Sequence, residues 1–269
     1  MLHQIGQHCG QIAGSSTAEA SSKVRSSATS VVVSAEAGCV CPATVTCTTS
    51  PWQRSGRAES GGFAHSFGLE TYAQAGTARD AADLRELIGT HLEGSAGPAD
   101  AVAAALAARA GLVADLDTCI ALDQRLDAMK TVSELRAASR QMGRQTARAA
   151  AALGEPFAEG LAAAIDDELT PGHHAVVFGA VTGRAGVSPE VAAAAYLHST
   201  AALLVGAGLR LLPIGQLEGQ RVLASMRETI ARLARRAAAA RADDMWSFTP
   251  GLEIAGIRHA TLEGRLFRS

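Results

Sequence analysis

Histidine and cysteine residues that could bind a metal ion occur at two places in the chain. His173 and His174 are adjacent after a Pro-Gly pair, and Cys39, Cys41 and Cys47 lie close together near the start. Imidazole and thiolate are ligands for nickel, zinc and copper. However, adjacent residues on a helix point about 100° apart, and no second Cys or His pair follows the cysteines at zinc-finger spacing. We therefore assign no metal ligands and interpret the two histidines as a helix entry.

Other catalytic patterns are incomplete. The glycine-rich segment 61–68 lacks the Gly-Lys-Ser/Thr ending of a phosphate-binding loop, and no predicted strand precedes it. The sequence has no Gly-x-Ser-x-Gly motif and no histidine with an evident carboxylate partner. Acidic clusters at 166–168 and 243–244 fall at expected helix ends, where solvated acids are common. We expect no catalytic residue and no cofactor.

The composition is that of a globular chain with balanced charge. Its 269 residues include 24 Lys and Arg and 26 Asp and Glu, giving a net charge of -2, and 48% are hydrophobic. Nucleic-acid or anionic-membrane binding needs a basic excess that this chain lacks. No uninterrupted apolar run approaches the roughly 18 residues of a spanning helix. The five unevenly placed cysteines do not form a secreted disulfide framework, which favours a reducing cytoplasm.

The composition and the spacing of apolar residues change near residue 60. Residues 1–60 are rich in Ser, Thr and Ala and show no sustained period, so we predict a poorly ordered leader. Residues 61–269 have helical spacing and almost no strand signal. The sequence therefore predicts an all-α fold, a single-domain helical bundle of roughly eight to ten helices.

Cap residues predict the helix boundaries. Thr77 with Asp80 predicts one helix start, Gly94 and Gly97 its end, and Pro98 the first turn of the next helix. Further starts are predicted at a capping box over 131–134, at Ser188-Pro189-Glu190 and at Thr249-Pro250, and short helices over 157–168 and 174–184.

A long amphipathic helix is expected after Pro213. It would place Leu217 and Ile230 inward and its arginines outward, as a solvated face or a contact for an acidic partner. Small residues are expected to let helices approach closely; they are Gly179, Gly183, Gly206 and Gly208.

The C-terminal end combines apolar and cationic residues over 262–269. Chain ends usually fray, so such a tail needs a stabilising contact. We expect it to dock on its own domain or on another protein.

Several segments of the chain resemble the UreF family of urease accessory proteins. They occur in order from Gly61 to the last residue, which makes the resemblance specific. The segments are GGFAHSFGLETY at 61–72, ELRAASRQMGR at 134–144, HAVVFGA at 174–180, VGAGLRLLPIGQ at 205–216 with GQR at 219–221, and RLFRS at 265–269.

The resemblance implies an all-helical, non-catalytic chaperone of urease maturation in the cytoplasm. Such a protein forms a homodimer, binds the accessory protein UreD (also called UreH) and recruits the GTPase UreG, and the assembly delivers nickel to apo-urease. Two alternatives stay open: an activator that donates an arginine to the GTPase, and a direct nickel carrier that uses the N-terminal cysteines and histidines.

The resemblance also implies partner-binding residues. Tyr72 and Arg265 match family positions linked to ordering of the C-terminal tail and complex formation, and Arg268, Phe267 and His65 follow by neighbourhood. One segment departs from the family: residues 48–60 lack the apolar first helix that usually precedes Gly-Phe-Ala-His. Loss of that helix would expose core surface.

Overall fold

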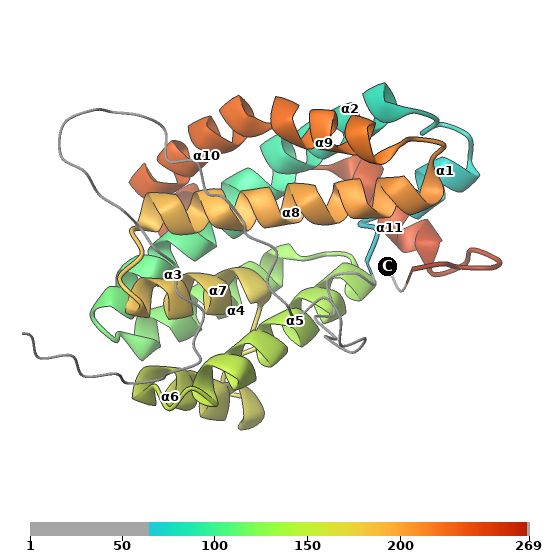
Figure 1. Ribbon diagram of the computed structural model, residues 1–269. Coiled ribbons are helices and arrows are strands. Elements are labelled where there is room, and N and C mark those ends of the chain that lie inside the picture. The colour runs from blue at the N-terminus through green and yellow to red at the C-terminus, as the bar shows by residue number, and fades with distance from the viewer. Residues whose placement is uncertain (1–64, 268–269) are drawn as a thin grey trace, which may run out of the picture. The chain divides into compact units, whose positions relative to one another are not determined.

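The computed structural model describes residues 65–267, and every regular element within this range is a helix (Figure 1). The predicted all-α fold class is therefore confirmed. The predicted leader over 1–60 and the departure at 48–60 lie outside the described residues.

The helices follow one another with short connections. Their bounds are α1 Leu69–Gln74, α2 Ala81–His91, η3 Leu92–Ala101, α3 Val102–Leu112, α4 Leu116–Met129, α5 Ser133–Ala151, α6 Pro156–Asp166, α7 His174–Arg184, α8 Pro189–Leu211, α9 Gln216–Ser225, α10 Arg227–Ala239, η4 Ala242–Asp244 and α11 Pro250–His259.

Helix α8 crosses the middle of the bundle in Figure 1, with α9 and α10 packed on one side and α3 and α7 on the other. Glycines let α7 approach α3 closely: a Cβ atom at Gly179 or Gly183 would collide with the carbonyl oxygens of Ala104 or Ala108. Gly208 likewise packs on Leu84. The core is built from small residues at these crossings, as predicted.

Local capping sets several boundaries; the starts at Ser188-Pro189 and Thr249-Pro250 are as predicted, whereas the start predicted from Thr77 lies three residues later, with Asp80 as the N-cap residue of α2. The Asp80 carboxylate accepts hydrogen bonds from the amides of residues 82 and 83, and Ser188 accepts one from Val191. Pro189 and Pro250 occupy the first turns of α8 and α11, where a missing N–H has no cost.

The predicted helix end at Gly94 and Gly97 is wrong. The chain continues from α2 into the π-helix η3, which contains Pro98 in its interior. The carbonyl oxygens of Gly94 and Pro98 instead accept hydrogen bonds from the backbone amides of Phe248 and Trp246, at 2.8 and 3.3 Å. The wider helix thus binds the extended segment that leads into α11.

Three other predictions are wrong. The capping box at 131–134 does not form: Val132 is the N-cap residue of α5, and Glu134 contacts α11 instead. The single helix after Pro213 is interrupted at Met226, whose amide bonds three residues back, and its Leu217 is exposed. Gly206, on α8, is not a site of close helix approach, because a Cβ atom there would meet nothing within 4 Å.

Helix α8 has the length and composition of a membrane span, which the sequence analysis did not anticipate. Over half of that apolar stretch, 56%, is buried inside the fold, including Leu197 and Leu204. Its apolarity is that of a central core helix.

Candidate partner-binding site

The C-terminal tail is held against α1 by a buried carboxylate. Glu70 is 1% exposed, and its two oxygens accept the backbone N–H groups of Leu266 and Phe267 at 2.6 and 3.0 Å. Helix α1 lies close to α11 because its N-cap residue is Gly68, with φ of 85° and no side chain to collide with Ala255. This close approach brings the Glu70 carboxylate to the tail.

His259, at the end of α11, joins this carboxylate to a second one. Its Nε2 lies 3.0 Å from Glu70 Oε2, and its Nδ1 lies 2.9 Å from Glu134 Oε2 on α5. One imidazole ring thus lies between two carboxyl groups. Glu134 also accepts a hydrogen bond from Arg265 at 3.1 Å. We call Glu70, Glu134, His259 and Arg265 the tail anchor.

The hydrogen bonds of the tail anchor act on the acidity of Glu70. Burial on its own would raise the pKa of this carboxyl. The amide of Leu266, the ring of His259 and the amide of Phe267 stabilise the anion, and the resulting pKa lies below the ordinary value. Glu70 is therefore charged at neutral pH and acts as an acceptor only.

The structure places two of the predicted partner-binding residues at the tail anchor. Arg265 pairs with Glu134, and the buried ring of Phe267 lies under the guanidinium of Arg210, 5.7 Å from its carbon. His65 is buried just before α1. Arg268 lies outside the described residues.

Tyr72 faces a different direction from Glu70. The two residues are two positions apart on α1, which separates them by about 200° around the helix. Tyr72 lines a groove of about 360 Å³ between α1, α2 and the start of α11, next to Gly251. Phe248 and Pro250 form its apolar wall, with Asp83 and Glu86 also lining it.

Five exposed apolar side chains belong to the C-terminal part of the chain: two precede α11, two lie on α11 and one lies in the tail. We call this set the C-terminal apolar face: Trp246, Phe248, Ile254, Ile257 and Leu266. Phe248 is 73% and Leu266 62% exposed, although they flank a well-anchored helix. Large apolar side chains left exposed close together in the chain are candidates for contact with a partner protein.

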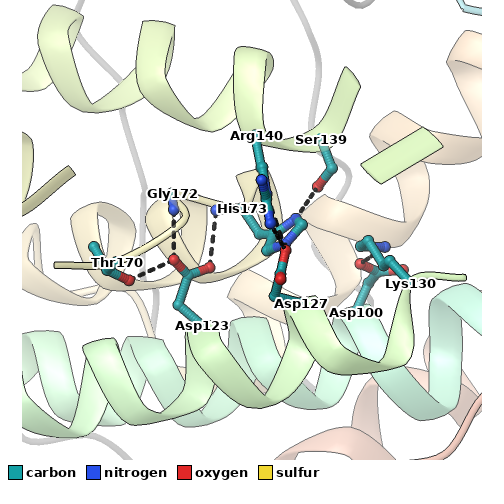
Figure 2. A network of polar contacts seen from close by, with 9 residues as sticks. All are labelled: Asp100, Asp123, Asp127, Lys130, Ser139, Arg140, Thr170, Gly172 and His173. Carbon is teal, nitrogen blue, oxygen red and sulfur yellow. Dashed lines mark hydrogen bonds and ion pairs between the residues drawn. The ribbon is translucent and has the colours of Figure 1, made fainter. Parts of the chain in front are cut away.

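A second polar network holds the loop before α7 (Figure 2). The Asp123 carboxylate accepts hydrogen bonds from Thr170 Oγ1 and from the amides of Gly172 and His173, at 2.6, 2.5 and 2.8 Å. The His173 ring contacts Asp127 on α4 and Ser139 on α5. The predicted helix entry at His173-His174 is confirmed, because α7 begins at His174.

A small cavity of about 70 Å³, lined by both apolar and polar side chains, lies beside the second network. Lys130 and Asp100 form an ion pair of 2.7 Å at its wall, shown in Figure 2. His91 also lines it, and burial lowers the pKa of this histidine to about 4. The imidazole is thus neutral at pH 7.

The described residues contain no group of three or more His, Cys, Asp or Glu side chains arranged to hold a metal ion. His173 and His174 point to different neighbours: His173 contacts Asp127, and the His174 ring stacks near Phe178 and Tyr196. The N-terminal cysteines lie outside the described part of the chain.

The sequence pattern does not indicate Glu70, Glu134 or His259 as site residues. Glu134 has the spacing of a capping box, and His259 has no carboxylate partner nearby in the sequence, because its partners are 125 and 189 positions away. The short, largely polar sequence of α1 carries no signal for the burial of Glu70, which follows from the packing of α11 and the tail against it.

Comparison with known proteins identifies the family. A family model named UreF matches residues 78–227. A urease accessory protein UreF from Rhizobium leguminosarum bv. viciae is 37% identical over 212 residues, which cover 78% of this chain and 90% of the relative. The UreF proteins of Bacillus sp. (strain TB-90) and Corynebacterium glutamicum (strain R) are each 32% identical over 211 residues, covering 78% of this chain and 93% and 92% of theirs.

The relatives match over most of their own length, so the similarity is not confined to one segment. The helical architecture agrees with the fold that the resemblance implied. The chain belongs to the UreF family of urease accessory proteins.

Proposed function

We propose that this chain is a non-catalytic scaffold of urease maturation in the cytoplasm. It forms a homodimer, binds a UreD/UreH-type accessory protein and recruits the UreG-type GTPase, so that nickel is delivered to apo-urease. In this proposal nickel is the cargo of the assembly, and this chain needs no cofactor of its own.

The C-terminal apolar face is the observation that carries the proposal. Its side chains are exposed while the backbone around them is fixed by η3 and by the tail anchor. A rigid apolar surface loses little conformational entropy when a partner covers it. Tyr72 lines the same groove as Phe248, and Arg265 directly precedes Leu266 in the tail. The two residues place a phenol and a cation next to this set.

Co-purification tests the proposal. The chain is expressed with UreD/UreH-type and UreG-type proteins, and capture of each is measured for Ile257→Ser, Tyr72→Ala and Arg265→Ala. Leu153→Ser is the matched control, since Leu153 is 86% exposed just after α5, outside the C-terminal apolar face. The proposal predicts loss of capture for the first three variants only. Equal capture by all variants would contradict it.

Nickel-dependent urease activity gives the functional readout. Co-expression of apo-urease and the accessory proteins with and without this chain should show activity only when the chain is present. The purified chain alone should hydrolyse neither urea nor GTP.

An activating role toward the GTPase is a second candidate, favoured by one observation. Helix α10 exposes Arg227, Arg235 and Arg236, while Arg232 pairs with Glu93. A single arginine that raises GTP hydrolysis by the partner about a thousandfold, and whose replacement abolishes the effect, would establish this role instead of a passive scaffold.

A further inference from the structure

The tail is attached to the helical domain through its backbone and through one buried side chain. Leu266 and Phe267 donate their amides to Glu70, while the Leu266 side chain is exposed. Among the described tail residues, Phe267 has the buried side chain, and its ring packs in the hydrophobic core. The position of the backbone at 266–267 therefore depends on the Glu70 carboxylate together with this ring.

The hydrogen bonds and ion pairs of the tail anchor form a closed ring of contacts. From the tail the path runs through Glu70 to His259, from His259 to Glu134, and from Glu134 back to the tail at Arg265. Each link joins a different part of the chain: α1, α11, α5 and the tail. Helix α11, which carries part of the C-terminal apolar face, is therefore fixed by the same carboxylate as the tail.

Glu70 cannot touch a partner directly, because it is enclosed by these contacts. The ion pair of Arg265 with Glu134 is partly exposed and on its own is a weak restraint. Without the Glu70 carboxylate, two amides would lose their acceptor, and the described part of the tail would be held by this pair and by the packing of the Phe267 ring.

We propose that Glu70 is a positioning residue for partner binding: it holds the backbone of residues 266–267 so that the tail and α11 present one preformed surface. This inference rests on the proposed function, since it requires that the C-terminal end binds a partner. A preformed surface binds without the ordering cost of a free tail.

A double-mutant cycle with the tail tests this proposal. The variants of the full chain are Glu70→Gln, a chain that ends at Gly264, and the two changes combined, and the ligand is the purified UreD/UreH-type protein of the same organism. We expect Glu70→Gln and the deletion each to weaken binding, raising the dissociation constant about tenfold or more. In the shortened chain, Glu70→Gln should have a much smaller effect than in the full chain, because the two tail amides are gone and only the contact of residue 70 with His259 remains.

Hydrogen exchange measured on the free protein reports the tail directly. In Glu70→Gln, the amides of Leu266 and Phe267 should exchange about tenfold faster or more, while amides of α3 and α8 keep their protection. Glu93→Gln is the matched control, because it removes a carboxylate from an ion pair on other elements. It should leave both binding and tail exchange as in the wild type.

A second variant covers the case in which Glu70→Gln does not fold. Leu266→Pro removes the donor from the tail side and leaves the core untouched. Its matched control is Leu266→Ala, which keeps the N–H. The proposal predicts faster exchange at Phe267 and weaker binding for Leu266→Pro than for Leu266→Ala.

The outcomes separate the proposal from the proposed function. If the wild-type chain does not bind the UreD/UreH-type protein, the proposed function fails. If the wild type binds and the deletion weakens binding, but Glu70→Gln binds like the wild type, the positioning role is wrong. If the effects of Glu70→Gln and of the deletion add, Glu70 acts through the fold and the positioning role is also wrong.

Discussion

His173 Nε2 lies 2.8 Å from Asp127 Oδ1, although the two residues are 46 positions apart in the chain. Burial lowers the pKa of His173, so the ring is neutral, and its N–H donates to the carboxylate. The other nitrogen then accepts a hydrogen bond from the Ser139 hydroxyl at 3.0 Å. One imidazole thus joins α4, α5 and the loop before α7.

Asp123→Ala should destabilise the protein strongly. Asp123 is buried and accepts three hydrogen bonds from this loop, and its loss leaves all three donors without an acceptor. We expect the free energy of unfolding to fall by about 3–5 kcal/mol, measured by urea denaturation. Asp117→Ala, on the exposed side of the same helix, is the control and should change it by less than about 0.5 kcal/mol. Similar losses for both variants would contradict the role of the network.

Features set by neighbouring residues could be predicted from the sequence. Asp80 and Ser188 bond to amides two or three positions away, so helix starts follow from the local pattern. Leu84 and Ile88 are four residues apart on α2 and are both buried, as this helical spacing of apolar residues predicts.

Features set by distant residues could not be predicted. Glu134 has the spacing of a capping box, but its carboxylate binds His259 and Arg265, more than a hundred positions away. In the same way, η3 continues past its glycines because its carbonyls bind the segment 246–248. The tail anchor depends on such distant pairings, and for this reason the sequence pattern does not predict it; Arg265 is named only by the family resemblance, as a partner-binding residue.

Gly183→Ala should destabilise the packing of α7 on α3. The added methyl group would collide with the carbonyl oxygen of Ala108, which belongs to a helix backbone and cannot move aside locally. We expect a loss of about 2–4 kcal/mol in thermal or urea unfolding. Gly206→Ala on α8 meets no atom within 4 Å and should stabilise the protein by about 0.5–1 kcal/mol. The opposite signs of the two substitutions are the test.

Cys119 should be unreactive in the folded protein. Burial raises the pKa of this thiol to about 12, with Asp115 and Asp123 contributing in the same direction, so almost no thiolate exists at pH 8. Alkylation by iodoacetamide, followed by peptide mass spectrometry, should modify Cys119 only after unfolding in urea. Rapid modification in the native protein would show that the thiol is accessible.

His91 should make the protein less stable in mild acid. Its pKa in the folded protein is about 4, against an ordinary value of 6.5, because burial disfavours the imidazolium. Between these two values the unfolded chain binds more protons than the folded one, so stability rises with pH and is lost as pH falls from 6.5 toward 4.

The size of this loss follows from the two pKa values. Because of His91, the free energy of unfolding should be about 2–3 kcal/mol lower at pH 4.5 than at pH 7. In His91→Phe this contribution disappears, while the contributions of His173 and His174, whose pKa values burial also lowers, remain. Urea unfolding of both proteins at pH 7 and 4.5 measures the difference. Equal pH dependence for the two proteins would mean that His91 takes up its proton in the folded state without penalty, and the cavity beside Lys130 and Asp100 would then have to admit water to solvate the charge.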